Sequence, residues 1–325
     1  MTTIKKILTH VKSWYFNQFI PKSLARNFIQ LDENRRHLLT ESVKRVYKYG
    51  DADHDTLTSL EAELDVRLMG HRTQIIPWLN SVKPLKGQHV LEIGCGNGTS
   101  TVALAEQGAI VTAIDIEDTL LADAQERCKI YGLEARFYLM NATEVSTTLK
   151  DETYDLVLFY AVLEHMTYAE RLAAIRQTYN MLAPGGLWCV IGTPNRLHFF
   201  DSHTSLLPFY YWLPDELAMQ YASFSPRNEF GSQFANAASF SQSDQLTFAR
   251  WGRGMSYHEL ELALGPLDNL TVLSSLKTYL KKRDILYRLL TSRSRNERYA
   301  IFLKGLYPSI HEAFFCPFLD LIIQK

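Results

Sequence analysis

The sequence has few cysteines and no long apolar run, and these absences exclude several classes of protein. Its 325 residues include four cysteines, which lie far apart and never form a Cys-x-x-Cys pair. We therefore expect no zinc site and no disulfide framework, and a reducing, cytoplasmic compartment fits best. No apolar run reaches the roughly 18 residues that a membrane-spanning helix needs. The net charge of −1 gives no basic field for nucleic acid, so no nucleic-acid partner is expected.

Acidic residues are absent from residues 1–30, which carry basic side chains and apolar or aromatic residues at helical spacing. A basic amphipathic helix of this kind can lie on an anionic membrane surface. It can also pack on its own domain or on a second copy of the chain. The sequence leaves three roles open for this segment: peripheral membrane contact, a homodimer interface or part of the core.

Short apolar segments alternate with amphipathic ones from residue 89 onward. The apolar segments predict seven strands, at 89–95, 109–116, 135–141, 154–162, 187–193, 269–277 and 316–325. Helices are predicted at 98–107, 117–131 and 168–182. This alternation predicts an α/β fold with a Rossmann-like, mostly parallel seven-stranded sheet that helices cover on both faces.

The segments on either side of this alternation suggest four parts of the chain. Helical patterns at 33–49 and 58–82, the second opened by a capping box of Thr58 and Glu61, make an N-terminal helical extension. Aromatic residues and then serines interrupt the alternation, as an insertion does; the aromatics suit a substrate lid or acceptor pocket, or pack on the sheet edge. The expected parts are the extension (1–85), the ligand-binding core (86–195), the insertion (196–255) and the C-terminal part of the fold (256–325).

Three glycines at alternate positions follow the first predicted strand in VLEIGCGNGTS, residues 90–100. Glycine belongs where the backbone turns left-handed or approaches a ligand closely, and ligands of open α/β sheets bind beyond the carboxyl ends of the strands. The dinucleotide fingerprint Gly-x-Gly-x-x-Gly does not fit, because Gly98 comes one position early. A phosphate loop would need a lysine that is missing here. Glu92 would repel a phosphate and suits a cationic ligand.

Asp115 ends the second predicted strand and can accept hydrogen bonds from a ribose diol. NAD and S-adenosylmethionine both contain such a ribose, so this residue alone does not choose between them.

Four blocks of sequence, in order, cover about residues 88–195. These blocks are VLEIGCGNG, VTAIDI, YDLVLFYAVLEHM and MLAPGGLWCVIGTPN. Together they resemble the motifs of class I S-adenosylmethionine-dependent methyltransferases, and the Val-Leu-Glu-His form is similar to the quinone-biosynthesis and small-molecule members of that group. The resemblance implies S-adenosylmethionine as the cofactor and S-adenosylhomocysteine as its product.

The resemblance also implies roles for individual residues. Glu92 would hold the glycine turn or orient the ammonium group of the cofactor, Asp115 would bind the ribose diol, and Ile116 would pack on the adenine. The residues expected to pass under the methionine part are Gly94, Cys95, Gly96 and Asn97.

Three further cofactor-binding residues follow later strands. Asn141 and Ala142 stand where the family often has an acid and a small residue, and the amide oxygen of Asn141 can accept a hydrogen bond from the adenine amino group. Tyr160 ends the fourth predicted strand, where the resemblance places the methyl group.

Histidine is the usual base near neutral pH, and His165 follows the fourth predicted strand directly. A hydroxyl acceptor must lose a proton during methyl transfer, so His165 is the candidate catalytic base, or else it orients the loop. His198, Asp201 and His203 in the insertion form a second set. Their spacing is compatible with a metal, but we predict none, because the sequence shows no further ligand cluster.

The sequence predicts methyl transfer to a small-molecule, lipid or glycan-precursor acceptor, with oxygen favoured as the acceptor atom. A nicotinamide-dependent oxidoreductase is the alternative, and the early third glycine and Glu92 count against it. A non-catalytic binding protein of the same fold is a third possibility, which a damaged glycine turn or a missing ribose acid would have indicated.

Overall fold

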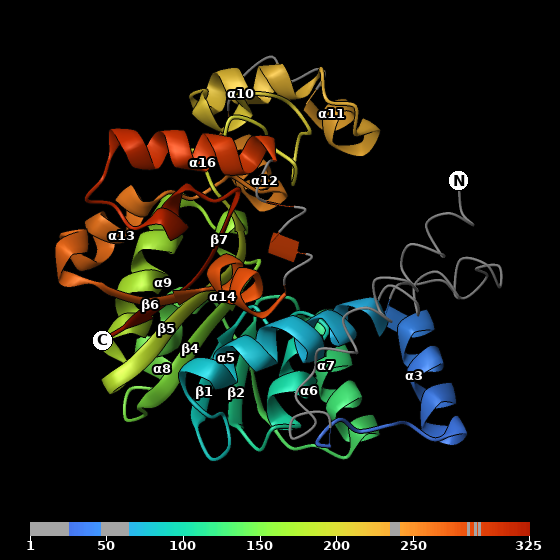
Figure 1. Cartoon of the computed structure of the whole chain (residues 1–325). Coiled ribbons are helices and arrows are strands. Elements are labelled where there is room, and N and C mark those ends of the chain that lie inside the picture. The colour runs from blue at the N-terminus through green and yellow to red at the C-terminus, as the bar shows by residue number, and fades with distance from the viewer. Residues whose placement is uncertain (1–25, 47–64, 235–240, 285–286, 289–290, 292–293) are drawn as a thin grey trace. The chain divides into compact units, whose positions relative to one another are not determined.

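The computed structural model describes residues 26–46, 65–234, 241–284, 287–288, 291 and 294–325 (Figure 1). The chain divides into two compact units. Unit 1 comprises residues 1–144 with 153–156, and unit 2 comprises residues 145–152 with 157–325. Unit 1 holds the glycine turn, and unit 2 holds His165 and the insertion.

Unit 1 alternates strands with helices, as the sequence predicts. Its main elements are α3 (Glu33–Val46), a π-helical turn (His71–Ile75), α5 (Ile76–Val82), β1 (His89–Ile93), α6 (Thr99–Ala105), β2 (Ile110–Asp115), α7 (Asp118–Tyr131) and β3 (Arg136–Leu139). Strands β1, β2 and β3 pair in parallel. Consecutive apolar residues of β1, Val90 and Leu91, are both fully buried, so this strand is covered on both faces, as its uninterrupted apolar sequence requires.

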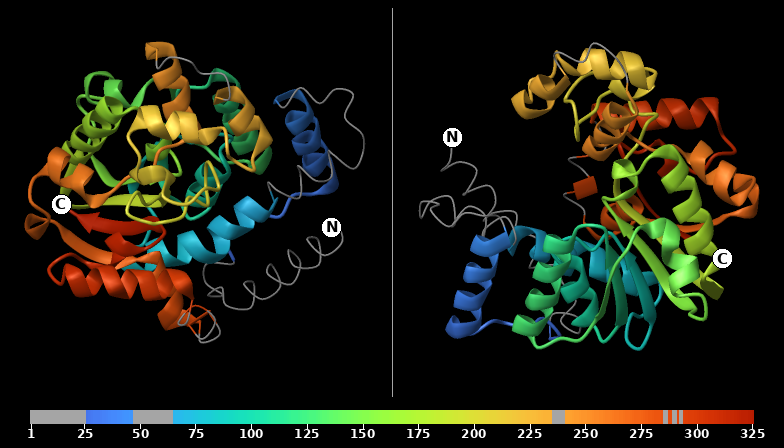
Figure 2. Two further views of the ribbon diagram at one scale, coloured as in Figure 1. Left: turned by 90° about the horizontal axis from the view of Figure 1, so that it is seen from above. Right: turned by 180° about the vertical axis from the view of Figure 1, so that it is seen from behind.

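Helix α3 lies beside α7 within unit 1 (Figures 1 and 2). The Ser42 hydroxyl in α3 donates a 2.8 Å hydrogen bond to the Asp123 carboxylate in α7. The helix predicted over 58–82 is helical from residue 65 onward, with the π-helical turn in its middle. Its capping box and residues 1–25 of the basic segment lie outside the described residues.

Unit 2 contains the insertion and the C-terminal strands. Its main elements are α8 (Val145–Thr148), α9 (Tyr168–Asn180), β5 (Leu182–Pro194), α10 (Asp215–Ala222), α11 (Asn228–Phe234), α12 (Gln242–Trp251), α13 (Tyr257–Leu264), β6 (Thr271–Ser275), α14 (Leu276–Arg283), α16 (Arg295–Leu306) and β7 (Phe318–Gln324). Strand β5 begins five residues before the predicted 187, because the chain around Gly185 and Gly186 hydrogen-bonds to Lys325 beyond β7.

The described strands form a seven-stranded sheet in the order β3-β2-β1-β4-β5-β7-β6, where β4 spans Tyr154–Tyr160. Strand β7 runs antiparallel to both β5 and β6. The predicted α/β fold with a mostly parallel seven-stranded sheet is therefore confirmed. In the described part of the chain, each helix is too short or too polar to cross a bilayer.

Candidate functional site

The turn between β1 and α6 requires glycine at three positions. Gly94, Gly96 and Gly98 have φ angles of 69°, 51° and 78°, in the left-handed region that residues with a Cβ enter only with strain. A Cβ on Gly98 would lie 2.8 Å from the Ala124 backbone in α7, whereas a Cβ on Gly96 would meet no described atom within 4 Å. Packing requires Gly98, while Gly96 presents open backbone that a ligand can approach.

A buried arginine supports the same turn from α7. The Nε of Arg127 donates a 2.7 Å hydrogen bond to the Asn97 carbonyl, and its guanidinium pairs with Asp123 at 3.0 Å. Asn97 is 7% exposed and Cys95 is 4% exposed, so the turn carries its side chains inward. Sequence reasoning missed Arg127, although it occupies a position in the helical pattern that apolar residues otherwise hold.

Glu92 is fully buried in β1 and faces the first turn of α6. Its carboxylate accepts hydrogen bonds from the hydroxyls of Ser100 and Thr101, the latter at 2.6 Å. Burial raises the pKa of Glu92 to about 7. These bonds tie the beginning of α6 to β1; contact with an ammonium group stays a prediction.

Asp115 joins the two loops at the carboxyl ends of β1 and β2. One carboxylate oxygen accepts the Gly96 N–H at 2.7 Å, and the other accepts the N–H of Glu117 at 2.9 Å. Each carboxylate oxygen has a further lone pair that can accept a hydroxyl. Ile116, next in the chain, is 55% exposed. The residues predicted for ribose and adenine thus stand at one edge, against the glycine turn.

Asn141 follows β3 and begins a short helical turn. Its side-chain oxygen accepts hydrogen bonds from both the N–H and the hydroxyl of Thr143, each at 3.0 Å. Those bonds use both lone pairs of the oxygen, so an adenine amino group would have to displace the Thr143 hydroxyl. Ala142 is buried. The roles of Asn141 and Ala142 in adenine binding stay predictions.

The glycines of the turn should separate ligand binding from folding. We expect Gly96→Ala to lower S-adenosylhomocysteine affinity and Gly98→Ala to lower the free energy of unfolding more. Each places a Cβ on a left-handed residue, at about 1–2 kcal/mol, and the Gly98 variant adds the collision with Ala124. Denaturant unfolding and calorimetric titration measure the two effects.

Gly87→Ala is the matched control for this pair. Gly87 precedes β1, has a φ of 76° and no described atom within 4 Å of its added Cβ. This variant should lose stability as Gly96→Ala does and retain ligand binding. If Gly96→Ala binds S-adenosylhomocysteine as tightly as Gly87→Ala, the backbone at Gly96 is not part of the binding surface.

In unit 2, the chain leaves β4 through a strained residue. Ala161 has a φ of 50°, a conformation rarely adopted by a residue with a Cβ. Its N–H donates a 2.8 Å hydrogen bond to Ile191 of β5, and a Cβ on Gly192 would lie 3.5 Å from the Ala161 Cβ. Strain of this kind is found where a structure holds functional residues in place. Tyr160, just before it, is half-buried, and its position beside the methyl group stays a prediction.

Glu164 and His165 follow this strained residue closely in the chain, and His203 of the insertion lies beside them. The Oε1 atom of Glu164 lies 3.9 Å from Nε2 of His165 and 3.7 Å from Nε2 of His203. The Glu164 side chain is fully buried, while those of His165 and His203 are 37% and 27% exposed. Burial raises the pKa of Glu164 to about 7, lowers that of His203 to about 4, and lowers that of His165.

Hydrogen bonds fix the tautomers of both histidines. Nδ1 of His165 lies 2.8 Å from the Arg250 carbonyl, which only accepts, so this nitrogen carries the proton. Nδ1 of His203 lies 3.0 Å from the Thr204 hydroxyl, which itself donates to the Gly252 carbonyl at 3.1 Å. Neutral His165 and His203 therefore both present Nε2 as a lone pair. Such nitrogens can accept a proton or bind a metal ion.

The second set of residues predicted in the insertion separates into different roles. The buried carboxylate of Asp201 accepts the N–H of His203 at 2.8 Å and the Tyr211 hydroxyl at 2.6 Å, so it organises the loop. His198 is buried and bonds through Nδ1 to the Phe200 carbonyl at 3.0 Å. Of this set, His203 alone joins His165. Glu164, which the sequence reasoning left without a role, joins them.

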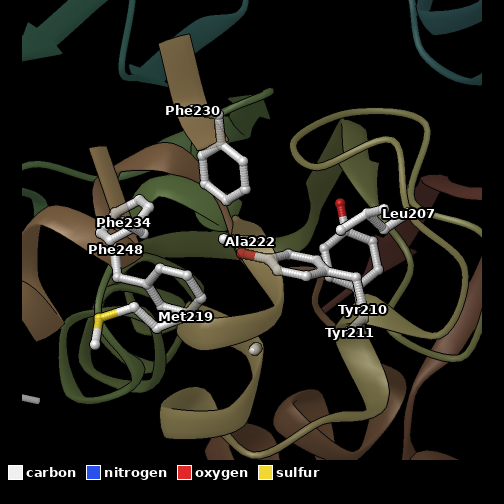
Figure 3. Packing of buried hydrophobic residues seen from close by; sticks show 9 residues of the cluster. Leu207, Tyr210, Tyr211, Met219, Ala222, Phe230, Phe234 and Phe248 are labelled. Atoms are coloured by element: carbon white, nitrogen blue, oxygen red, sulfur yellow. The ribbon is translucent and has the colours of Figure 1, made fainter. Parts of the chain in front are cut away.

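Aromatic residues of the insertion form a hydrophobic core of their own (Figure 3). Its members are Leu207, Tyr210, Tyr211, Ala218, Met219, Ala222, Phe230, Phe234 and Phe248. The rings of Phe234 and Phe248 meet edge to face, with centroids 5.2 Å apart. Mutual packing thus accounts for the burial of these aromatics, while the role of the insertion as a substrate lid stays a prediction. Phe209 and Trp212 are 48% and 50% exposed and remain available to a ligand.

Residues 90–186 match the family described as methyltransferase domain. A ubiquinone biosynthesis O-methyltransferase of Pseudomonas entomophila (strain L48) is 32% identical over 111 residues, which are 34% of this chain and 47% of that protein. A protein of the same name from Coxiella burnetii (strain Dugway 5J108-111) is 32% identical over 103 residues, 31% of this chain and 42% of that one. The chain thus spans about half the length of the curated relatives it matches or less.

Among solved structures, the magnesium protoporphyrin IX methyltransferase of Synechocystis PCC 6803 with bound S-adenosylhomocysteine shares 17% identity with this chain. The match covers 72% of this chain and 85% of that one, with a TM-score of 0.41. The segment that matches the methyltransferase-domain family, residues 90–186, contains the glycine turn, Asp115 and the Glu164–His165 pair. Over residues 90–186, this chain is therefore similar to class I, S-adenosylmethionine-dependent methyltransferases.

Proposed function

We propose that the chain transfers the methyl group of S-adenosylmethionine to a hydroxyl oxygen of a small organic molecule. The observation that carries this proposal is the 2.7 Å hydrogen bond between Asp115 and the Gly96 N–H. It holds a carboxylate suited to a ribose diol against an open glycine backbone. The name of the curated relatives supports oxygen as the acceptor atom. A lipid-like or glycan-precursor acceptor fits the same chemistry.

The reaction is a direct displacement at the methyl carbon. An acceptor oxygen forms the new O–C bond as the C–S bond of the sulfonium breaks, and S-adenosylhomocysteine leaves with the bonding electron pair. Positioning supplies much of the rate of such a reaction. The hydroxyl proton must pass to a base. We propose Nε2 of His165 for this step, either as that base or as a ligand of a metal ion.

Incubation of the purified chain with methyl-labelled cofactor and a set of catechols, phenols and cell-derived metabolites tests this function. Mass spectrometry should find the label on an oxygen of an organic product, together with S-adenosylhomocysteine. Calorimetry should show S-adenosylhomocysteine binding and no NAD binding. If the chain binds NAD and not S-adenosylhomocysteine, the proposal is wrong. That result would instead support the nicotinamide-dependent oxidoreductase, which the comparisons do not support.

The acceptor's delivery is a separate part of the proposal. The basic segment 1–30 would hold the chain at an anionic membrane that supplies a lipid-like acceptor, or would form a dimer. Co-sedimentation with anionic vesicles, with and without residues 1–30, distinguishes the two. Salt-sensitive binding that is lost on truncation supports the membrane; a dimer that becomes a monomer supports the interface.

A further inference from the structure

We infer that Glu164, His165 and His203 form a binding site for one divalent transition-metal ion, with Zn²⁺ as the reference ion. Their ligand atoms all lie within 4.8 Å of one another. Two imidazole nitrogens and one carboxylate oxygen are a ligand set that suits zinc and neighbouring metals. The set brings together a loop after β4 and a residue 38 positions later in the insertion.

Electron pairs converge at this point without a donor to satisfy them. Both histidines present Nε2 lone pairs, because their Nδ1 atoms carry the protons. The Oε1 atom of Glu164 is buried and has no hydrogen-bond partner among the described residues. A buried polar atom without a partner costs about 1–3 kcal/mol or more. A cation accepts all three lone pairs at once, whereas a bridging water can donate only two hydrogens.

The groups behind the ligands are those that metal sites use. A histidine that binds a metal usually donates its other N–H to a carbonyl, a carboxylate or a fixed polar group. Here His165 donates to the Arg250 carbonyl, and His203 donates to the Thr204 hydroxyl. The remaining oxygen of Glu164 accepts the Thr193 hydroxyl at 3.1 Å. All three ligands are thus oriented by bonds on their far sides.

Two arginines near the site are already paired with other carboxylates. Arg171 pairs with the buried Glu259 at 2.7 Å, and Arg250 pairs with Glu170 at 2.7 Å. The fully buried Glu164 therefore remains the negative charge that a metal cation would meet.

The two carboxylate–histidine distances require only a small contraction. Zinc binds nitrogen and oxygen at about 2.0–2.2 Å, so two tetrahedral ligands lie roughly 3.4 Å apart. The two carboxylate–histidine separations, 3.9 Å and 3.7 Å, exceed this by a few tenths of an ångström. The histidine side chains are partly exposed and can move inward. Three protein ligands leave at least one coordination position open, as in catalytic rather than structural zinc sites.

The open position would take an oxygen ligand, and, on the proposed function, that ligand is a hydroxyl of the methyl acceptor. This assignment changes two expectations from the sequence: no metal was predicted, and His165 was predicted as a base. The histidine spacing alone could not show the site, because Glu164 and His165 lie in one segment and His203 in another.

Metal binding by the full, untagged chain tests the inference. After removal of metals with a chelator, equilibrium dialysis against Zn²⁺ should load one ion per chain, and Co²⁺ should give a visible spectrum with nitrogen ligands. His203→Ala and Glu164→Gln should lower Zn²⁺ affinity by about 100-fold or more. Thr204→Val removes the hydroxyl behind His203 together with its bond to the Gly252 carbonyl. This variant keeps all three ligands and should lower Zn²⁺ affinity by roughly 10- to 100-fold.

His37→Ala removes an exposed histidine on α3 and should leave Zn²⁺ affinity unchanged. Denaturant unfolding without metal shows whether each variant is folded; in Glu164→Gln the new amide can donate to a histidine, so folding should persist. Equal Zn²⁺ affinity in the unmodified chain and a folded Glu164→Gln variant overturns the site. Calorimetry with S-adenosylhomocysteine on the metal-free chain keeps this result separate from the proposed function, since either binding can fail alone.

Discussion

Replacement of Asp115 by alanine is expected to weaken S-adenosylhomocysteine binding by roughly 30- to 800-fold. The variant loses two hydrogen bonds from the ribose diol to a charged acceptor, equivalent to about 2–4 kcal/mol. It also loses the bond to the Gly96 N–H, so the glycine turn becomes less ordered and the loss should reach the upper part of this range. Isothermal titration calorimetry gives the affinities directly.

Two companion variants separate ribose binding from support of the turn. Asp115→Asn keeps one accepting oxygen and should lose less affinity than Asp115→Ala. Asp118→Ala removes a nearby exposed acid at the beginning of α7 and should bind as the unmodified chain does. If Asp115→Ala is folded and binds the ligand with unchanged affinity, Asp115 has no part in the cofactor site.

His165→Ala should lower turnover by roughly 10²- to 10⁴-fold while S-adenosylhomocysteine binding persists. Loss of Nε2 removes either a proton acceptor or a metal ligand. In either role, His165 would be needed when the acceptor hydroxyl reacts. The rate constant of methyl transfer is measured with labelled cofactor under single-turnover conditions, so that product release does not limit the observed rate. A variant with near-normal turnover would exclude both roles.

His203→Ala distinguishes a lone base from a ligand set. If His165 acts alone as the base, the His203 variant should keep most of its turnover. If the three residues act as a unit, both single variants should fall by similar factors, and the double variant should fall little further, because parts of one unit are not additive. Restoration of turnover in the unmodified chain by Zn²⁺ after chelation supports the unit.

The central strands of the sheet were predictable from sequence because burial on both faces leaves nearly continuous apolar runs, as in β1 and β4. The insertion was not. Helices α10, α11 and α12 have only 8, 7 and 10 residues, too few turns for a clear apolar stripe. Their aromatics pack on one another, as Phe230 and Phe248 do, and a density of aromatics does not reveal what covers them. The reversed direction of β7 likewise depends on tertiary pairing.

The candidate residues of unit 1 and those of unit 2 differed in the same way. The glycine turn and Asp115 lie in consecutive strand–loop–helix units, so the parallel pairing of β1 and β2 places them together. His165 was found because it follows a predicted strand directly. Its partners were not, because the sequence does not show that Glu164 is buried. His203 is brought close to Glu164 only by the fold of the insertion.

The two ends of the insertion lie side by side just beyond the end of β5. The N–H of Met255 bonds to the Pro194 carbonyl, and the N–H of Arg196 bonds to the Met255 carbonyl, both at 2.8 Å. Segments whose ends meet in this way can be exchanged without rerouting the rest of the chain. Residues 196–255 are thus one contiguous, replaceable segment that contributes His203 and the Arg250 carbonyl. A related protein could therefore gain or lose the histidine of the proposed metal site by replacing one contiguous segment, while the glycine turn and Asp115 stay unchanged.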